Sequence, residues 1–302
     1  MTANPRIGFI GLGFMGHGMA HNLLAKGFPL TVMAHRKREA VDDLAGKGAV
    51  EVTAAKELVE RSDVVILCVT GAEQVDDLLR RPDGIAAGAG DGLIVIDCTT
   101  SAPATLQTLA VDYPRITFVD APLGRAPKDA WAGALSVMVG ARPETLEQIR
   151  PVLSAFATTI QHAGLPGSGH TLKLINNILS LGYGALHAEA LLIARKAGLS
   201  TQTYDELVGS SRMNCDFYQT FMGWARNGDS TTHQFALGVA DHTITDASEL
   251  ARSLGLEAGV LEAVRSHYVR AVSDGFDEAN LPELVRAVAH ANGVALLPAT
   301  DE

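Results

Sequence analysis

The chain has 302 residues, more than one ordinary domain contains, so its length alone favours two domains. Its 34 acidic residues outnumber 24 lysines and arginines, and the formal net charge of −10 is spread along the chain without long basic runs. This distribution argues against nucleic acid as the main partner and favours a small molecule.

Cysteine usage and the N-terminal segment bear on location. The three cysteines, Cys68, Cys98 and Cys215, lie far apart without metal-ligand spacing, which fits a reducing compartment. No signal peptide is visible after Met1, and no uninterrupted apolar run has the length of a membrane span. We therefore expect a cytoplasmic protein without a metal site and without a membrane partner.

The first elements predict a dinucleotide site. Residues 6–10 read as a buried strand and residues 19–26 as a helix. The segment before the helix is a glycine motif, which consists of Gly11, Leu12, Gly13, Phe14, Met15 and Gly16. In such a motif the first glycine permits a tight turn, the second lets the backbone approach a pyrophosphate, and the third lets helix and strand pack closely. The phosphates are expected at the helix N-terminus, where free N–H groups favour anions.

The end of the second predicted strand, residues 30–34, bears on the choice of cofactor. In NAD-binding folds an acidic residue about 20 positions beyond the glycines binds the ribose hydroxyls. Here the sequence continues with His35, Arg36, Lys37 and Arg38 instead. Basic side chains suit a 2′-phosphate, and Arg36 is the best-shaped donor, so we expect NADP rather than NAD. A solvated basic turn that tolerates either cofactor is the alternative.

Strand and helix patterns alternate as far as residue 162. Further strands are predicted at 64–69, 93–98, 117–121, 135–140 and 158–162, with helices at 38–45, 56–61 and 144–155. This alternation predicts an α/β fold, a Rossmann-like doubly wound parallel sheet with helices on both faces. Where two of the strands end, we expect more cofactor contacts from Val69, Thr70, Thr99 and Thr100.

The pattern changes at a turn cluster, residues 164–167. Only helical patterns follow it, at 204–210, 217–224, 235–254, 261–272 and 282–290. We therefore predict a cofactor-binding domain at residues 1–164 and an all-helical domain at residues 165–302.

One long helix is predicted from residue 167 to residue 198, about 30 residues or roughly 45 Å. It is apolar nearly all round, as buried helices are. Yet Lys173, Asn176, Asn177 and Ser180 share one face at positions i, i+3, i+4 and i+7. A buried amine and buried amides need partners, which a wet cavity or a ligand would supply. A surface stripe on an amphipathic helix is the alternative.

A second group of candidate residues follows a predicted strand. Gly124, Arg125 and Ala126 form a loop between Pro122 and Pro127, at the carboxyl end of the strand, where such sheets bind ligands. An arginine held in this loop can fork onto an anionic group of a substrate. The alternative is an exposed arginine that binds nothing.

Together these motifs resemble the β-hydroxyacid dehydrogenase family. The resemblance covers most of the chain. The residues that carry it are the glycine motif with Met19, Ala20, His21, Asn22 and Leu23, then Asp120, Ala121 and Pro122, then Gly167 and Gly169 with Lys173, Asn176 and Asn177. It implies a nicotinamide-dependent oxidoreductase that interconverts a small acidic hydroxyacid and its semialdehyde, with a catalytic lysine at position 173. It also implies a helical domain through which the chain forms a homodimer or a tetramer.

The chain departs from the family pattern in two places. Where the family loop reads Ser-Gly-Gly, this chain has Gly124, Arg125 and Ala126. The variant resembles the Gly-Arg-Thr loop of 3-sulfolactaldehyde reductases, which implies that the arginine faces a sulfonate and that Asn176 and Ser180 also bind the substrate. At residues 241–243 the chain has Asp-His-Thr where the family commonly has Lys-Asp, so His242 is the candidate to replace a lysine near the cofactor.

The residues suggest a mechanism for reducing an aldehyde. Lys173 would give a proton to the developing oxyanion and take it back in the reverse direction, because partial burial and a nearby arginine would lower its pKa. Asn176, or else Asn177, would orient the reacting oxygen or the amine. A structural ion pair between Lys173 and Glu189 or an aspartate is the alternative. The acid group of the substrate would be held by Arg125, Ser180 and Thr100.

Other functions remain open. Imine reductases share this fold but generally lack the lysine, so Lys173 and Arg125 count against them, and a non-catalytic cofactor-sensing module needs neither residue. Within the dehydrogenase reading, 3-hydroxyisobutyrate dehydrogenase and tartronate semialdehyde reductase activities compete with sulfonate reduction. We interpret His170, His187 and His233 as structural.

Overall fold

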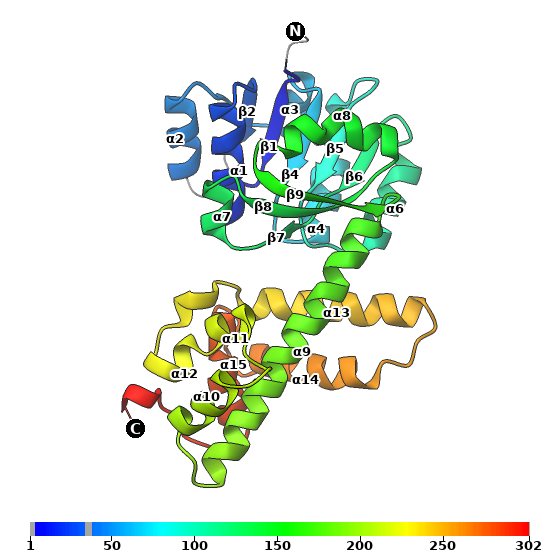
Figure 1. The fold of residues 1–302 in the computed structure, drawn as a ribbon. Coiled ribbons are helices and arrows are strands. Elements are labelled where there is room, and N and C mark those ends of the chain that lie inside the picture. Colours follow the sequence, from blue (N-terminus) through cyan, green and yellow to red (C-terminus); the bar gives the residue numbers. More distant parts are fainter. Residues whose placement is uncertain (1–3, 34–37, 302) are drawn as a thin grey trace. The chain divides into compact units, whose positions relative to one another are not determined.

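The chain folds into two compact units, Met1–Lys173 and Leu174–Glu302, in a computed structural model that describes residues 4–33 and 38–301. The first unit contains the strands, and the second is built from helices (Figure 1). The α/β and all-helical character predicted for the two parts of the chain is confirmed.

In the described residues, nine strands form one sheet in the order β3-β2-β1-β4-β5-β6-β8-β7, with β9 paired to β8. Their bounds are β1 Ile7–Ile10, β2 Leu30–Met33, β3 Val50–Val52, β4 Val64–Leu67, β5 Ile94–Asp97, β6 Thr117–Asp120, β7 Leu123–Gly124, β8 Leu135–Gly140 and β9 Ala157–Gly164.

Most neighbouring strands are parallel, as predicted, but β8 runs antiparallel to both β6 and β7. The reason lies in the connections. Parallel neighbours need a long crossover, whereas β6, β7 and β8 follow one another through short segments and one five-residue helix. The chain therefore turns back on itself here.

Helices cover both faces of the sheet (Figure 1). Alternate strand residues face opposite sides, so Ile7 and Phe9 pack with one set of helices and Ile10 with the other. The first set is α1 Phe14–Ala25, α2 Glu39–Gly46, α7 Pro127–Trp131 and α8 Pro143–Leu153. The second set is α3 Ala55–Glu60, α4 Ala72–Arg80, α5 Ile85–Gly88 and α6 Pro103–Asp112. Of these, α4, α5, α6 and α7 were absent from the predicted pattern.

The second unit has its own core, in which Tyr218, Phe221 and Tyr268 are fully buried. The Tyr268 hydroxyl donates to the backbone oxygen of Leu181 over 2.8 Å, which satisfies the one polar atom of that ring. The helices are α10 Thr201–Gly209, α11 Asp216–Phe221, α12 Gly223–Asn227, α13 Leu237–Ser253, α14 Gly259–Ser273 and α15 Leu284–Ala291, with α9 from Leu174 onward.

Helix α9, Ser168–Lys196, is the long helix that the sequence predicts, with 29 residues. It ends before Gly198, whose φ of +86° is the left-handed conformation that favours glycine after a helix. Its length and composition alone would also fit a membrane span, but half of its most apolar stretch is buried within the protein.

A buried carboxylate anchors the start of α9 to the sheet. Asp120, the last residue of β6, is fully buried, and its Oδ1 and Oδ2 accept the backbone N–H groups of Gly167 and His170, each over 2.7 Å. A negative charge is favourable at a helix N-terminus. A Cβ at Gly140 would lie 2.2 Å from Asp120 Oδ1, and one at Gly169 would lie 2.2 Å from a backbone oxygen. Both glycines are therefore needed for this approach.

We predict that Asp120→Ala lowers the free energy of unfolding by about 2–4 kcal/mol, because two buried N–H groups lose their acceptor. Urea denaturation measures the change. Asp112→Ala is the matched control, since it breaks only an exposed ion pair with Arg80 and should cost about 1 kcal/mol or less. Equal losses in the two variants would contradict the anchoring role.

Candidate functional site

The candidate cofactor residues that follow β1, β4 and β5 gather at one edge of the sheet. Ile10, Leu67, Asp97 and Asp120 are successive register partners across β1, β4, β5 and β6. Each of the predicted contact segments begins just after this row, since parallel strands end at the same edge. The carboxyl edge of such a sheet is where ligands bind.

The glycine motif has the local geometry that a dinucleotide requires. Gly11 has a φ of +102°, and a Cβ there would lie 2.2 Å from the backbone oxygen of Cys68. A Cβ at Gly16 would lie 1.9 Å from the oxygen of Gly11, whereas one at Gly13 would meet no atom within 4 Å. Gly13 also offers no side chain to the first N–H groups of α1. Open space beside free N–H groups fits the phosphates of a dinucleotide.

Leu12, Phe14 and Met15 complete this loop at the start of α1. Phe14 is 76% exposed, while Leu12 and Met15 are half-buried and pack against the core of the unit. The intervening residues therefore hold the loop in place on one side and leave it open on the other.

The ends of β4 and β5 are tied together by a short hydrogen-bonded chain. The N–H of Val69 donates to Thr99 Oγ1 over 3.2 Å, and the N–H of Thr99 donates to Asp97 Oδ1 over 2.9 Å. Thr99 is thus buried, and its hydroxyl oxygen already accepts a hydrogen bond. Thr70 is exposed and Thr100 is half-buried. The polar side chains open to a ligand here are those of Thr70 and Thr100, and Val69 is half-buried beside them.

The predicted cofactor-selecting residues His35, Arg36 and Lys37 lie outside the described residues. The neighbouring Arg38 is described, and its guanidinium donates to the carboxylates of Glu51 and Asp42. Those carboxylates raise the pKa of Arg38. This arginine is therefore a charged side chain held in ion pairs at the N-terminus of α2.

Arg125 adopts an unusual backbone conformation. Its φ is +76°, the left-handed region that favours glycine, and it is the one described residue other than glycine with positive φ. Its side chain is exposed, and Nη1 donates to the backbone oxygen of Ala134 over 2.8 Å. Gly124 pairs with Ser136 on β8, and the N–H of Ala126 donates to Asp129 Oδ2 over 3.0 Å. The guanidinium is therefore held by the segment between α7 and β8.

Lys173 lies near the start of α9, one turn after His170. Its side chain is half-buried, and burial lowers its pKa to about 8. No arginine contributes to this shift, contrary to the expectation from the sequence. Within the described ranges Lys173 has no ion-pair partner, and Glu189 pairs with His267 instead, over 3.0 Å. An amine in this state can exchange a proton near neutral pH.

A buried pair that the sequence did not reveal lies beside the helix start. His170 and Asp97 are both almost completely buried, with His170 Nε2 3.6 Å from Asp97 Oδ2. Burial raises the pKa of Asp97, and the charge of His170 opposes that rise. The signal available in the sequence was Asp97 at a strand end, but a partner 73 positions away is set only by the fold.

The remaining candidates belong to the second unit. Asn176 is exposed and its amide donates to Asn177 Oδ1 over 3.5 Å, whereas Asn177 is only 6% exposed. Ser180 is half-buried, and its hydroxyl donates to the backbone oxygen of Asn177 over 3.3 Å. His242 is exposed on α13. Asn176 is therefore the amide better placed to meet a ligand.

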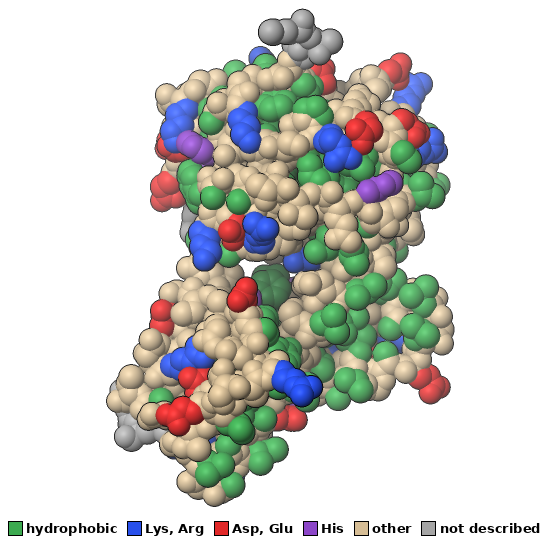
Figure 2. All heavy atoms as spheres, viewed as in Figure 1, with side chains coloured by type: hydrophobic (Ala, Val, Ile, Leu, Met, Phe, Trp, Pro, Cys, Tyr) green, Lys and Arg blue, Asp and Glu red, His purple; other side chains and the backbone are tan. Residues whose placement is uncertain are grey.

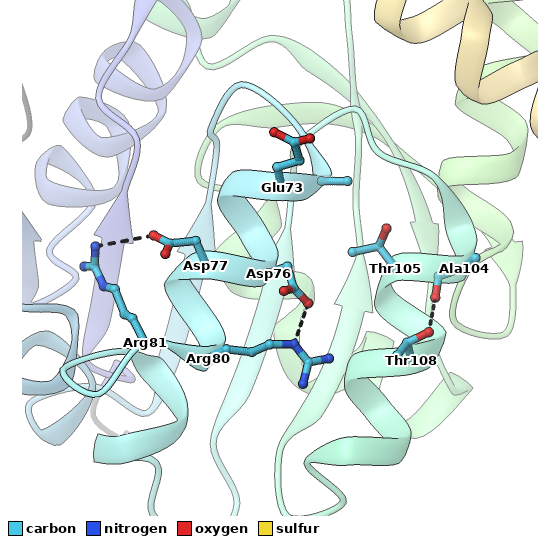
Figure 3. A pocket seen from close by; sticks show the side chains of 9 residues that line it. Glu73, Asp76, Asp77, Arg80, Arg81, Ala104, Thr105 and Thr108 are labelled. Atoms are coloured by element: carbon cyan, nitrogen blue, oxygen red, sulfur yellow. Dashed lines mark hydrogen bonds and ion pairs between the residues drawn. The ribbon is translucent and has the colours of Figure 1, made fainter.

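A separate groove of about 770 Å³ lies along α4 and α6 (Figure 3). Glu73, Thr105 and Thr108 line it, and its two arginines face carboxylates: Arg80 pairs with Asp76 and Arg81 with Asp77. None of the candidate site residues lines this groove, and its arginines are already neutralised, so we do not assign the site to it.

Two family models match the chain. Residues 6–164 match the NAD-binding domain of 6-phosphogluconate dehydrogenase. Residues 167–288 match a model described as NAD-binding of NADP-dependent 3-hydroxyisobutyrate dehydrogenase. The two matches together span both units.

Individual proteins agree with the family models. The chain is 36% identical over 214 residues to 2-(hydroxymethyl)glutarate dehydrogenase of Eubacterium barkeri, covering 70% of each protein. It is 29% identical over 272 residues to 3-sulfolactaldehyde reductase of Escherichia coli, covering 89% of this chain and 91% of the relative. Among solved structures, Psf3 in complex with NADP+ and 2-OPP has a TM-score of 0.79 at 28% identity, covering 93% of this chain and 99% of that one.

Proposed function

Because the chain belongs to the β-hydroxyacid dehydrogenase family, we propose that it interconverts a small acidic β-hydroxyacid or hydroxysulfonate and its semialdehyde, with Lys173 as acid and base. The chain is an NAD(P)-dependent dehydrogenase acting on CH–OH groups. The observation that carries the lysine assignment is the amine itself, which is half-buried and has a pKa of about 8.

The nicotinamide cofactor, when bound, supplies or accepts the hydride. Lys173 Nζ gives its proton to the substrate oxygen in reduction and removes the hydroxyl proton in oxidation. A pKa near the working pH lets the same amine serve both directions. The exposed amide of Asn176, three residues further along α9, orients the reacting oxygen, with Asn177 and Ser180 beside it on the helix.

Arg125 binds the acid group of the substrate in this proposal. A residue other than glycine in the left-handed region costs conformational energy, and such strain often occurs at binding sites. The guanidinium is free to leave the Ala134 oxygen because it is exposed and held by one hydrogen bond in the described structure. Gly124, Ala126 and Thr100 border the same sheet edge. The relative named 3-sulfolactaldehyde reductase supports a sulfonate as the acid group.

We favour NADP as the cofactor. The basic run His35, Arg36 and Lys37 suits a 2′-phosphate, and the solved relative with 28% identity is a complex with NADP+. Thr70, Thr100 and His242 are the further side chains assigned to the cofactor, with the backbone of the glycine motif at its phosphates.

Two other functions have less support. An imine reductase has no use for an anion-binding arginine, and a cofactor-sensing module has no use for a lysine with a lowered pKa. Carboxylate substrates, as in 3-hydroxyisobutyrate dehydrogenase or tartronate semialdehyde reductase activity, are the alternative within the same reaction. A substrate panel separates these cases.

A second copy of the chain is the proposed partner of the helical unit. Ile175, Leu179, Leu186 and Ile193 share one face of α9, and their exposed fractions lie between 47% and 71%. Figure 2 shows hydrophobic side chains, in green, on this side of the helical unit. Exposed apolar area of this kind marks an interaction surface. We assign residues 1–164 mainly to cofactor binding, with Thr100 and the loop at Gly124–Ala126 reaching the substrate. We assign residues 165–302 mainly to the rest of the substrate site and to the homodimer, in the cytoplasm.

Lys173→Met should reduce kcat by about 100-fold or more, the scale of a lost general acid, with little change in cofactor affinity. Lys196→Met, at the other end of α9, is the matched control and should leave kcat unchanged. In the wild type, kcat/KM for reduction should fall as pH rises above about 8, where the amine loses its proton, and the rate of oxidation should rise over the same range. A variant with wild-type turnover would refute the assignment.

Arg125→Gly should raise KM for an acidic substrate by about 10- to 100-fold, the scale of a charge-assisted hydrogen bond, and should leave NADPH affinity unchanged. Glycine suits the positive φ, so the variant should be at least as stable as the wild type. The exposed neighbour Lys128→Ala is the control.

The assay uses NADP and NAD with 2,3-dihydroxypropane-1-sulfonate, 3-hydroxyisobutyrate, glycerate and threonate. We expect higher activity with NADP and the largest Arg125 effect on the sulfonate. An unchanged KM on every substrate would refute the anion-binding role, and no turnover of any of them with either cofactor would refute the proposed reaction.

Leu186→Asp should weaken the homodimer, because a charge would be buried in the apolar face of α9. Analytical ultracentrifugation measures the mass of the wild type and the variant. Leu254→Asp is the matched control, an equally exposed leucine outside that face, since Leu186 is 63% and Leu254 64% exposed. A monomeric wild type would contradict the proposal.

A further inference from the structure

Asn22 belongs to the motif that follows the glycines, yet no role has been assigned to it so far. It lies on α1, the helix whose N-terminus borders the cofactor loop. Its side-chain Nδ2 donates to the backbone oxygen of Gly18 in its own helix over 2.8 Å. The backbone oxygens of Ala130 and Trp131, the last residues of α7, lie 2.9 and 3.1 Å from the same nitrogen, so its two hydrogens serve three acceptors and one hydrogen is shared. One amide therefore joins two helices that are more than 100 positions apart in the sequence.

The two helices touch backbone to backbone at this point. A Cβ at Gly18 would lie 2.7 Å from the nitrogen of Trp131 and 2.8 Å from the carbonyl carbon of Ala130, so only glycine allows the contact. Ala130 is fully buried in the core that α1 also joins. The Ala130 oxygen also accepts the N–H of Gly133 over 3.3 Å, whereas Asn22 is the donor that the structure shows for the Trp131 oxygen at the end of α7. The end of this short helix is therefore fixed to α1.

The beginning of α7 is fixed to the loop that carries Arg125. Asp129, in the first turn, accepts the N–H of Ala126 through Oδ2 over 3.0 Å. The backbone of Asp129 also accepts the N–H of Ala134 over 2.8 Å, and the Ala134 oxygen accepts from Arg125. A five-residue helix with both ends held acts as a rigid link.

We propose that Asn22 is a positioning residue, which sets the geometry of the substrate loop, Gly124–Ala126, from the cofactor-binding helix through α7. The inference rests on the proposed function for the meaning of that loop. The link itself is a property of the first unit alone. Loss of the Asn22 amide should loosen the loop without disturbing the glycine motif, which lies at the opposite end of α1.

Hydrogen–deuterium exchange tests the link without any assay of turnover. In Asn22→Ala, amides of residues 124–134 should exchange about tenfold faster or more, because two hydrogen bonds that hold α7 are lost. Asn22→Asp keeps the size of the side chain but has no N–H to donate, so it should behave in the same way. Lys26→Ala is the matched control, since it removes a hydrogen bond from the residue that follows the same helix to a different acceptor, the Ser154 oxygen. Unchanged exchange in both Asn22 variants, or wild-type exchange in Asn22→Asp alone, would overturn the proposal.

A second readout separates this inference from the proposed function. In both Asn22 variants KM for the acidic substrate should rise about tenfold while NADPH affinity, measured by fluorescence titration, stays within about twofold of wild type. A parallel loss of NADPH affinity, or an unchanged KM, would overturn the proposal. If the wild type turns over none of the substrates, the proposed reaction has failed, and the exchange measurement alone decides the role of Asn22.

Discussion

The arrangement of this protein depends on a buried negative charge, the carboxylate of Asp120. A carboxylate without hydrogen bonds is too costly to keep in a protein interior. Asp120 is stabilised because both of its oxygens accept backbone N–H groups at the beginning of α9. The strand end and the helix start are thereby fixed to each other, and Lys173 follows one turn further along the helix. The position of the amine on the first unit is a consequence of this contact.

The sheet supplies the second constraint. Four strands end in register, and the segments that follow them carry the glycine motif, Thr70, Thr100 and the substrate loop. Short-range hydrogen bonds then fix the individual segments, as between Val69 and Thr99. At this edge of the sheet some side chains already form hydrogen bonds within the protein, and others are exposed to a ligand. This distinction separates Thr99, which holds the structure together, from Thr100.

At a few positions the residue type is set by what must bind or pack there and not by its own backbone preference. Arg125 occupies a conformation that suits glycine, and the family pattern has glycine at that place. Gly18 and Gly140 leave room for a neighbouring backbone and for a carboxylate, respectively. At Arg125 the chain keeps a charged side chain in spite of the local cost. At the two glycines it gives up a side chain so that another group can approach.

The sequence by itself determined the fold class, the dinucleotide motif and the long helix, because these depend on the spacing of residues that are near one another in the chain. The spacing of Lys173, Asn176 and Ser180 in the sequence also predicted that they share one face of α9. It did not reveal α4 and α6, the antiparallel β8, the Asp97 and His170 pair, or the contact of Asn22 with α7. The Asp97 and His170 pair and the Asn22 contact are decided by partners distant in sequence. The apolar spacing of α4, whose Val75, Leu78 and Leu79 are buried, was a local signal that the prediction missed, and the antiparallel β8 follows from short connections. The burial that lowers the pKa of Lys173 exists only after the chain has packed.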